Sequence, residues 1–137
     1  MSNILICDDE KDIVSALRIC LAAEGYEIFE AYNGIQALEI IKANDIHLVL
    51  LDIMMPEMDG ISTLAKIRES YNMPVLFISA KSEDADKILG LNIGADDYIT
   101  KPFNIIEVVA RVKSNLRRYM RLGSNVSSSR IEIRGLY

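Results

Sequence analysis

The chain has 137 residues, close to the ~150 expected of one globular domain, and half of them are hydrophobic. This composition excludes collagen-like, low-complexity and intrinsically disordered chains. Residues 1–110 hold 8 Lys and Arg against 19 Asp and Glu, whereas residues 111–137 hold 7 against one. The acidic part argues against direct binding to duplex DNA, because its field repels phosphates. The basic end is interpreted as a solvated helix end or linker in preference to a nucleic-acid arm.

The sequence carries no pattern typical of membrane insertion or secretion. Its longest stretch without a charged side chain covers 11 residues, from Ser70 to Ala80, far short of the ~20 needed to cross a bilayer. The first residues lack the basic segment, apolar run and cleavage site of a signal peptide. Cys7 and Cys20 lie inside apolar segments, as buried thiols in a reducing compartment do. We therefore expect a soluble, cytoplasmic domain without a membrane partner.

Five short apolar runs with strand character follow one another along the chain, at residues 4–7, 26–29, 46–51, 75–78 and 97–99. Segments with helical spacing separate them, and their apolar stripes are Ile13, Leu17 and Leu21, then Ile35, Leu38 and Ile41, then Ile61, Leu64 and Ile67. The first, third and fourth runs are apolar without alternation, as in strands that helices cover on both sides. The pattern predicts an α/β fold with a doubly wound, five-stranded parallel sheet and five helices.

The C-terminal part of the sequence changes character. Residues 104–122 predict a long amphipathic helix, and the Gly and Ser residues that follow have linker composition. Residues 130–134 then alternate polar and apolar side chains, which predicts one strand, and one strand cannot stand alone. We therefore expect a first domain over residues 1–121, a linker over residues 122–129, and the start of a truncated second domain over residues 130–137.

Polar side chains follow four of the expected strands at their carboxyl ends, where parallel sheets collect ligands: Asp8, Asp9 and Glu10 after the first, Asp52 after the third, Ser79 after the fourth and Lys101 after the fifth. Each has a structural alternative. Asp9 suits a helix cap, Ser79 can satisfy backbone groups in a turn, and Lys101 can be a surface charge. Four such strand ends together nevertheless predict one shared site.

The expected cluster has a defined chemistry. Carboxylates that lie close together repel one another and need a cation, and hard oxygen ligands suit Mg²⁺. With a metal bound, the site can accept a phosphoryl group, for which Asp52 is the candidate nucleophile. Lys101 then stabilises the charge of the transferring group, and Ser79 offers its hydroxyl to a phosphoryl oxygen. An acidic loop is, in contrast, ill suited to hold the phosphate of a flavin directly.

Four motifs carry a family resemblance: ILICDDE at residues 4–10, LLDIMMPEMDG at residues 50–60, ISA at residues 78–80 and KPF at residues 101–103. In this order and spacing, over residues 3–121, the sequence resembles the receiver domain of response regulators in two-component signalling. The resemblance implies a flavodoxin-like receiver fold with strand order 2-1-3-4-5. It also implies a sensor histidine kinase as the partner that donates the phosphoryl group.

The resemblance assigns a role to each matching residue. It makes Asp52 the phosphoacceptor, and it places Mg²⁺ on four groups: Asp8, Asp9, Asp52 and the backbone carbonyl of Met54. Ser79 becomes the switch hydroxyl, Lys101 the phosphate-reading lysine, and Pro102 the second residue of a cis peptide bond. Tyr98 becomes a rotameric switch that turns inward when Ser79 engages the phosphoryl group. Its structural alternative is an aromatic ring packed at the edge of the sheet.

Further residues resemble the OmpR/PhoB-type subfamily, in which a winged-helix DNA-binding domain follows the receiver. They are GADDYI at residues 94–99, followed by Glu107, Arg111 and Arg118. By this resemblance, phosphorylated chains form a homodimer with three charge pairs across the interface: Lys87 with Glu107, Asp97 with Arg111, and Asp96 with Arg118. The alternative for Glu107 and Arg111 is an ion pair within one helix, worth only ~0.3–0.5 kcal/mol. DNA contact is expected only through the second domain, which is absent from this chain.

The sequence therefore predicts a phosphorylation-driven switch that controls transcription. The receiver gains and slowly loses a phosphoryl group by its own catalysis but turns over no metabolite, so we do not expect an enzyme. Two alternatives stay open. A Mg²⁺-dependent phosphatase of the haloacid-dehalogenase kind also uses an aspartyl nucleophile, although residues 8–10 lack its Asp-x-Asp pattern. A receiver that never takes phosphate and acts as a binding module is opposed by the complete set of Asp9, Asp52, Ser79 and Lys101.

Overall fold

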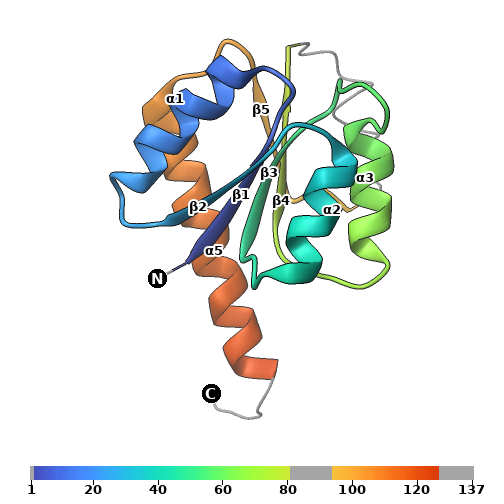
Figure 1. Ribbon diagram of the computed structural model, residues 1–137. Coiled ribbons are helices and arrows are strands. Elements are labelled where there is room, and N and C mark those ends of the chain that lie inside the picture. The colour runs from blue at the N-terminus through green and yellow to red at the C-terminus, as the bar shows by residue number, and fades with distance from the viewer. Residues whose placement is uncertain (1, 81–93, 127–137) are drawn as a thin grey trace.

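Figure 1 shows the computed structural model, which describes residues 2–80 and 94–126. Its elements follow the chain as β1 (Asn3–Cys7), α1 (Lys11–Ala22), β2 (Glu27–Ala31), α2 (Gly34–Ala43), β3 (Leu48–Asp52), α3 (Gly60–Arg68), β4 (Val75–Ser79), β5 (Asp97–Thr100) and α5 (Ile105–Val126). None of the helices in these two ranges is long and apolar enough to cross a membrane.

The five strands form one parallel sheet with the order β2-β1-β3-β4-β5. Helices α1 and α5 cover one face of the sheet, and α2 and α3 cover the other (Figure 1). The predicted α/β fold and its strand order are thus confirmed. A further helix was expected between β4 and β5, where residues 81–93 lie outside the described part of the chain.

The central strands are buried on both faces, which explains their unbroken apolar runs. In β1, Leu5 and Cys7 belong to the core cluster under α2 and α3, whereas Ile4 and Ile6 belong to the cluster under α1 and α5. All four side chains are fully buried. A strand covered on both faces leaves no solvated position for a charged side chain. The polar residues are therefore placed at the strand ends.

A close contact between α3 and β3 positions the residues around Asp52. Asp59 caps α3, since its carboxylate accepts a hydrogen bond from the N–H of Ser62 at 2.7 Å. The helix then begins at Gly60, where an added Cβ would lie 2.3 Å from the carbonyl oxygen of Asp52. Because only glycine allows this approach, α3 starts directly against the end of β3.

Most element boundaries differ from the sequence-based expectation by one or two residues, and the end of α5 differs by four. Strand β3 begins at Leu48 and not at residue 46, because the N–H of Asn3 donates to the ring Nδ1 of His47 at 2.9 Å in place of a backbone carbonyl. Helix α5 continues to Val126, past the expected end at residue 122. A single glycine costs a helix only about 1 kcal/mol, so Gly123 does not end it. The first residues of the expected linker are thus helical, and the division into domains stays a prediction.

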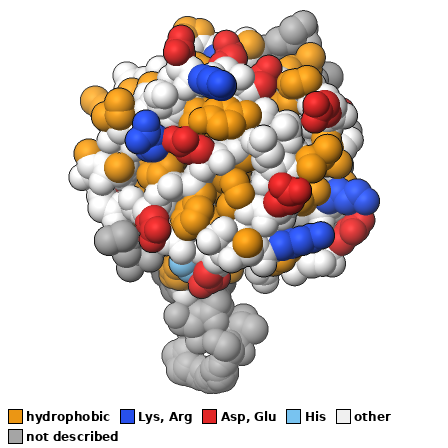
Figure 2. All heavy atoms as spheres, viewed as in Figure 1, with side chains coloured by type: hydrophobic (Ala, Val, Ile, Leu, Met, Phe, Trp, Pro, Cys, Tyr) orange, Lys and Arg blue, Asp and Glu red, His pale blue; other side chains and the backbone are white. Residues whose placement is uncertain are grey.

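Charged side chains of both signs are interspersed on the face of the molecule seen in Figure 2, with hydrophobic side chains between them. Two contacts of charged side chains join α1 to the edge strand β2 and the residue after it: Arg18 contacts Glu30 at 2.5 Å, and Lys11 Nζ lies 5.8 Å from the ring centre of Tyr32. Such exposed pairs contribute little to stability. The buried sheet, and not the surface charge, therefore holds this part of the fold together.

Candidate functional site

The carboxyl ends of β1, β3, β4 and β5 meet at one edge of the sheet. The register places Cys7 beside Leu51 and Asp52 beside Ile78, so residues that follow different strands become neighbours in space. The structure brings all six of the polar residues predicted for a shared site to this edge: Asp8, Asp9, Glu10, Asp52, Ser79 and Lys101.

Three of these side chains form an acidic cluster, which we define as Asp8, Asp9 and Asp52. One oxygen of each lies within 4.8 Å of the others. Asp8 and Asp52 are 0% and 3% exposed, whereas Asp9 is open to solvent. The N–H of Glu10 donates to Asp8 Oδ1 at 2.9 Å. The other oxygen, Asp8 Oδ2, is buried, and the ammonium nitrogen of Lys101 lies 2.9 Å from it.

Asp52 carries a strongly perturbed carboxyl group. Burial raises the pKa of Asp52 from 3.8 to about 7, and the charge of Asp8 adds to this effect. Lys101 and the N–H of Met54 act in the opposite direction on the pKa, the latter through a 3.4 Å hydrogen bond to Asp52 Oδ1. Burial and like charge thus oppose ionisation of the cluster, and a bound cation would relieve both.

The ammonium group of Lys101 closes the acidic cluster on one side. Its Nζ lies 2.8 Å from Glu10 Oε1, 2.9 Å from Asp8 Oδ2 and 3.9 Å from Asp52 Oδ1. The side chain is 12% exposed, so the alternative of a surface charge is wrong. Burial lowers the pKa of Lys101, but the contacts with Glu10 and Asp8 outweigh burial and leave the pKa above its ordinary value. Lys101 is therefore a cation held among carboxylates.

Ser79 and the peptide bond after Lys101 complete this edge of the sheet. Ser79 is fully buried at the end of β4, and its carbonyl accepts a hydrogen bond from the N–H of Lys101 at 2.7 Å. The peptide bond between Lys101 and Pro102 is cis. The alternative of Asp9 as a helix cap is wrong, because Glu10 occupies the cap position of α1 and its side chain makes no capping hydrogen bond.

Two further predicted residues lie near the site, in β5 and in the loop after β3. Tyr98 is half-buried in β5, pairs with Phe77 of β4, and packs against the core under α2 and α3. This position is compatible with both interpretations of Tyr98, the switch and the packed aromatic ring. Met54 follows Asp52 in the loop before α3, and its side chain is exposed.

Five of the six residues expected to pair across a dimer belong to the described part of the chain, and all five have partners within the same chain. Arg111 Nη1 lies 2.7 Å from Asp97 Oδ1, and Arg111 Nε lies 3.1 Å from Glu107 Oε2. Asp96 forms an ion pair with a side chain of α3 at 2.9 Å. Lys87 lies outside the described residues. The intrahelical pair of Glu107 and Arg111 is thus present, and the pairing between two chains stays a prediction.

Two residues that organise this face were not singled out from the sequence. Asn115 of α5 is buried; it donates to Asp97 Oδ2 at 3.1 Å and accepts a hydrogen bond from Arg118 at 2.5 Å. Arg68 of α3 binds Asp96 and also the backbone carbonyls of Met73 and Gly94. A polar residue beside the buried stripe of α5 was a signal for Asn115. Arg68 had no such signal, because its partners are distant in the sequence.

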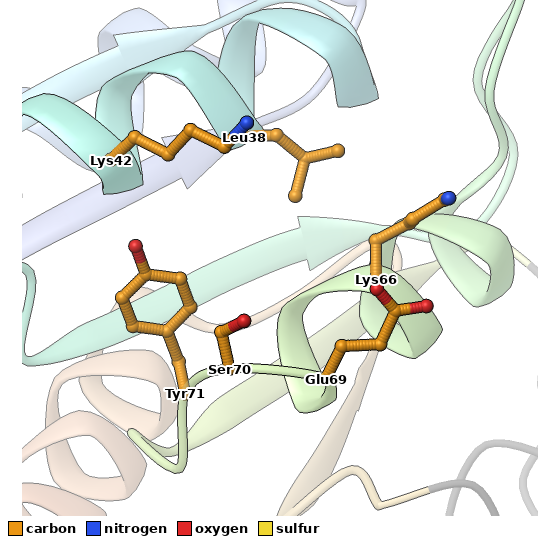
Figure 3. A pocket seen from close by; sticks show the side chains of 6 residues that line it. All are labelled: Leu38, Lys42, Lys66, Glu69, Ser70 and Tyr71. Atoms are coloured by element: carbon orange, nitrogen blue, oxygen red, sulfur yellow. The ribbon is translucent and has the colours of Figure 1, made fainter.

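A cavity of about 290 Å³ lies between α2 and α3 and is lined by Leu38, Lys42, Lys66, Glu69, Ser70 and Tyr71 (Figure 3). These residues lie toward the C-terminal ends of the two helices or just beyond them. Helices that connect parallel strands run opposite to the strands, so this end lies away from the strand ends that carry the acidic cluster. The cavity and the cluster are therefore separate features.

The cysteines and the histidine take no part in the cluster chemistry. Both cysteines are free thiols, with Cys7 buried and Cys20 half-buried. Burial, together with the negative charge of Asp8, raises the pKa of Cys7 to about 12, so this thiol stays protonated and unreactive. His47 precedes β3 and therefore lies at the edge of the sheet opposite to the cluster, where its ring accepts the backbone hydrogen bond from Asn3.

The donor set of the acidic cluster fits a hard divalent cation. Its donors are carboxylate oxygens, which Mg²⁺ and Ca²⁺ prefer over nitrogen or sulfur. Asp8 Oδ2 is buried beside the ammonium group of Lys101, at 2.9 Å, and is a further carboxylate oxygen that a cation could bind. Burial and the charge of Asp8 raise the pKa of Asp52 although Lys101 lowers it, so the lysine compensates the carboxylates only in part. These residues can therefore hold a metal ion.

Known proteins resemble this chain in sequence. Residues 4–113 match the family model of the response regulator receiver domain. The chain is 46% identical over 130 residues to the regulatory protein VanRc of Enterococcus gallinarum, a match that covers 95% of this chain and 56% of that protein. It is 49% identical over 116 residues to the response regulator GtcR of Aneurinibacillus migulanus, covering 85% of this chain and 48% of that protein. The chain thus spans about half the length of these curated relatives.

The fold also resembles solved structures. The receiver domain of the Francisella response regulator 1452 superposes on this chain with a TM-score of 0.82 and 37% sequence identity. The match covers 86% of this chain and 98% of that domain. Nearly the whole of one receiver domain therefore corresponds to the described fold.

Proposed function

This chain belongs to the family of response regulator receiver domains, and from that premise we propose that Asp52 accepts a phosphoryl group from the phosphohistidine of a sensor histidine kinase. One observation carries the proposal. The buried carboxylate of Asp52 shares a small volume with Asp8 and Asp9, and it faces the ammonium group of Lys101 at 3.9 Å. A carboxylate beside a cation site and a fixed positive charge is suited to attack phosphorus.

The proposed step transfers a phosphoryl group between two side chains. An oxygen of Asp52 attacks phosphorus, the phosphorus–nitrogen bond of the phosphohistidine breaks, and its electron pair returns to the imidazole. The product is an acyl phosphate, and its later hydrolysis restores the carboxylate and releases inorganic phosphate. Lys101 stabilises the charge of the transferring group, and the Ser79 hydroxyl donates to a phosphoryl oxygen. The receiver catalyses its own modification and turns over no other substrate.

We propose Mg²⁺ as the cation of the site, held by Asp8, Asp9, Asp52 and the backbone carbonyl of Met54. The hard oxygen donors and the buried Asp8 Oδ2 support this choice. When bound, Mg²⁺ offsets the charge of the carboxylates and polarises the phosphoryl oxygens. The orientation of the nucleophile comes from the chain itself, because the N–H of Met54 holds Asp52 Oδ1 at 3.4 Å.

We propose that the aspartyl phosphate changes the face formed by β5 and α5. It adds roughly two negative charges, toward which Ser79 and Lys101 move, and Tyr98 fills the space they vacate. In an OmpR/PhoB-type regulator this change favours a homodimer. Arg111 is engaged with Asp97 of its own chain at 2.7 Å, so dimerisation exchanges this contact for the same contact between two chains. Transcription is then controlled in the cytoplasm through a winged-helix DNA-binding domain outside this chain.

Labelling with a small acyl phosphate tests the assignment of the nucleophile. In acetyl phosphate and Mg²⁺, the intact mass of the wild-type chain should rise by one phosphoryl group that hydroxylamine removes. Asp52→Asn should abolish the labelling, because an amide does not attack phosphorus as a carboxylate does. Asp9→Ala should slow it by removing a cation ligand. Glu57→Gln is the matched control, since it removes an exposed charge from the loop after β3 without touching the cluster.

The same experiment can contradict the proposal in two ways. Hydroxylamine-labile phosphate that persists on the Asp52→Asn chain would place the nucleophile on another residue. Failure of the wild-type chain to take up label from either acetyl phosphate or a phosphorylated histidine kinase would instead favour the binding-module alternative.

A further inference from the structure

We propose that Glu10 is a positioning residue that holds Lys101 away from Asp52 until a phosphoryl group arrives. Its carboxylate is the closest anion to the lysine, although the cation site and the phosphoacceptor have been assigned to other residues. The inference rests on the proposed function, because the group that displaces Glu10 is the phosphoryl group on Asp52.

The distances around Lys101 show which anions hold it. Nζ lies 2.8 Å from Glu10 Oε1 and 2.9 Å from Asp8 Oδ2, both of which follow β1. Asp52 Oδ1 lies 3.9 Å away, beyond the length of a hydrogen bond. A phosphoryl group on Asp52 would bring new anionic oxygens toward this ammonium group, which has three N–H donors and already has two close partners. The phosphoryl oxygens then compete with those two partners for the ammonium group.

Of these two partners, Glu10 is the one that can release the lysine. Asp8 is fully buried, and its other oxygen is held by the backbone N–H of Glu10 at 2.9 Å. The Glu10 side chain is 61% exposed. Glu10 occupies the cap position of α1, but its side chain makes no capping hydrogen bond. Among the described residues, Lys101 is its only ion-pair partner. Glu10 can thus turn into solvent at little cost, whereas Asp8 cannot.

The contact therefore competes with the phosphoryl group for the same ammonium group. It stabilises the unphosphorylated chain and is weakened in the phosphorylated one, so its removal shifts the equilibrium toward the phosphorylated form. For a partly exposed ion pair we expect a shift of about twofold to fivefold. The negative charge of Glu10 also repels an incoming anion, so removing the charge would favour the phosphorylated form even without the contact. Two substitutions of Glu10 separate the effect of the charge from that of the contact.

A zero-length crosslink in the full chain tests the contact itself. A carbodiimide joins a carboxylate to a touching amine with loss of one water, and peptide mass spectrometry should find Glu10 joined to Lys101 in the metal-free chain. Adding Mg²⁺ and beryllofluoride, a mimic of the aspartyl phosphoryl group, should cut the yield about fivefold as the lysine moves. The pair of Lys113 and Glu24, which lie 2.7 Å apart on other elements, is the internal control and should crosslink equally in both conditions.

The affinity for beryllofluoride in Mg²⁺ then separates contact from charge. Glu10→Gln removes the charge, whereas Glu10→Asp keeps the charge but is one methylene too short to reach Lys101. Both variants should bind beryllofluoride about twofold to fivefold more tightly than wild type by calorimetry. The control Glu57→Gln, which removes an exposed charge from the neighbouring loop, should stay within about twofold of wild type.

Each contrary outcome has a defined meaning. A Glu10→Asp chain that binds like wild type would overturn the inference, because charge alone would then explain Glu10→Gln. A missing crosslink between Glu10 and Lys101 in the metal-free chain would overturn the inference, and so would a crosslink yield that beryllofluoride does not change. If the wild-type chain still binds beryllofluoride in these cases, the proposed function is unaffected. Absence of beryllofluoride binding to the wild-type chain would overturn the proposed function, and this inference with it.

Discussion

Replacing the proposed nucleophile Asp52 by asparagine should stabilise the fold. The carboxylate is 3% exposed and lies beside Asp8, and burial raises its pKa from 3.8 to about 7. An amide of nearly the same shape carries no charge, and its oxygen can keep the hydrogen bond from the N–H of Met54. The Asp52 carboxylate, which the proposed phosphoryl transfer requires, thus lowers the free energy of unfolding of the metal-free chain.

The size and the sign of the effect follow from the two pKa values. The difference of about three pH units, at about 1.4 kcal/mol each, sets an upper limit of about 4 kcal/mol. Because the pKa of Asp52 is raised on folding, the folded chain binds this proton more tightly than the unfolded chain. The stabilisation by the protonated group is complete below pH 3.8 and is lost as the pH rises to about 7. The advantage of Asp52→Asn therefore grows over this window and is constant above it.

Urea denaturation followed by circular dichroism in EDTA measures the effect. Between pH 5.5 and pH 8 the free energy of unfolding of wild type, relative to Asp52→Asn, should fall by about 2 kcal/mol. Adding Mg²⁺ should narrow the difference at pH 8, since the cation binds the folded wild-type cluster more tightly. The exposed-charge control Glu57→Gln should differ from wild type by no more than about 0.5 kcal/mol at every pH.

Two results would contradict the predicted stabilisation by Asp52→Asn. One is an Asp52→Asn chain that is less stable than wild type at pH 8 in EDTA, which would mean that Lys101 and the backbone compensate the buried carboxylate in full. The other is a stability difference of equal size at pH 5.5 and pH 8, which would show that the carboxyl group does not titrate in this window.

Three further predictions concern the contact between α3 and β3, the face formed by β5 and α5, and residues 127–137. Gly60→Ala should lower the free energy of unfolding by about 2 kcal/mol or more, because its Cβ would meet the carbonyl oxygen of Asp52 at 2.3 Å; an unchanged urea midpoint would contradict this contact. Arg111→Glu should weaken the beryllofluoride-activated dimer in sedimentation by facing Asp97 with like charge, and Asp97→Arg in the same chain should restore it in part. If neither change shifts the dimerisation constant, this face is a solvated surface. Deleting residues 127–137 should change the melting temperature by less than about 2 °C, whereas a larger loss would show that they pack on the receiver.

The fold class and the edge of the sheet that carries the chemistry could be predicted from the order of the residues alone. Unbroken apolar runs and helical stripes are local patterns, and they predict covered parallel strands without knowledge of any contact. Because parallel strands all end at one edge, the positions of Asp8, Asp52 and Lys101 directly after such runs were enough to bring them together. The structural alternatives, a helix cap for Asp9 and a surface charge for Lys101, were excluded by the structure.

Which side chains are in contact depends on the three-dimensional arrangement of the elements. Lys101 lies closer to Glu10 than to Asp52, and Arg111 is already paired with Asp97 of its own chain. The pKa of Asp52 near 7 depends on its burial and on the distance to Asp8, and neither is written in the order of the residues. Electrostatic interactions change steeply over a few ångströms, whereas hydrophobic patterns tolerate shifts of a residue or two. Sequence patterns therefore located the site, and the side-chain geometry determined its charge balance.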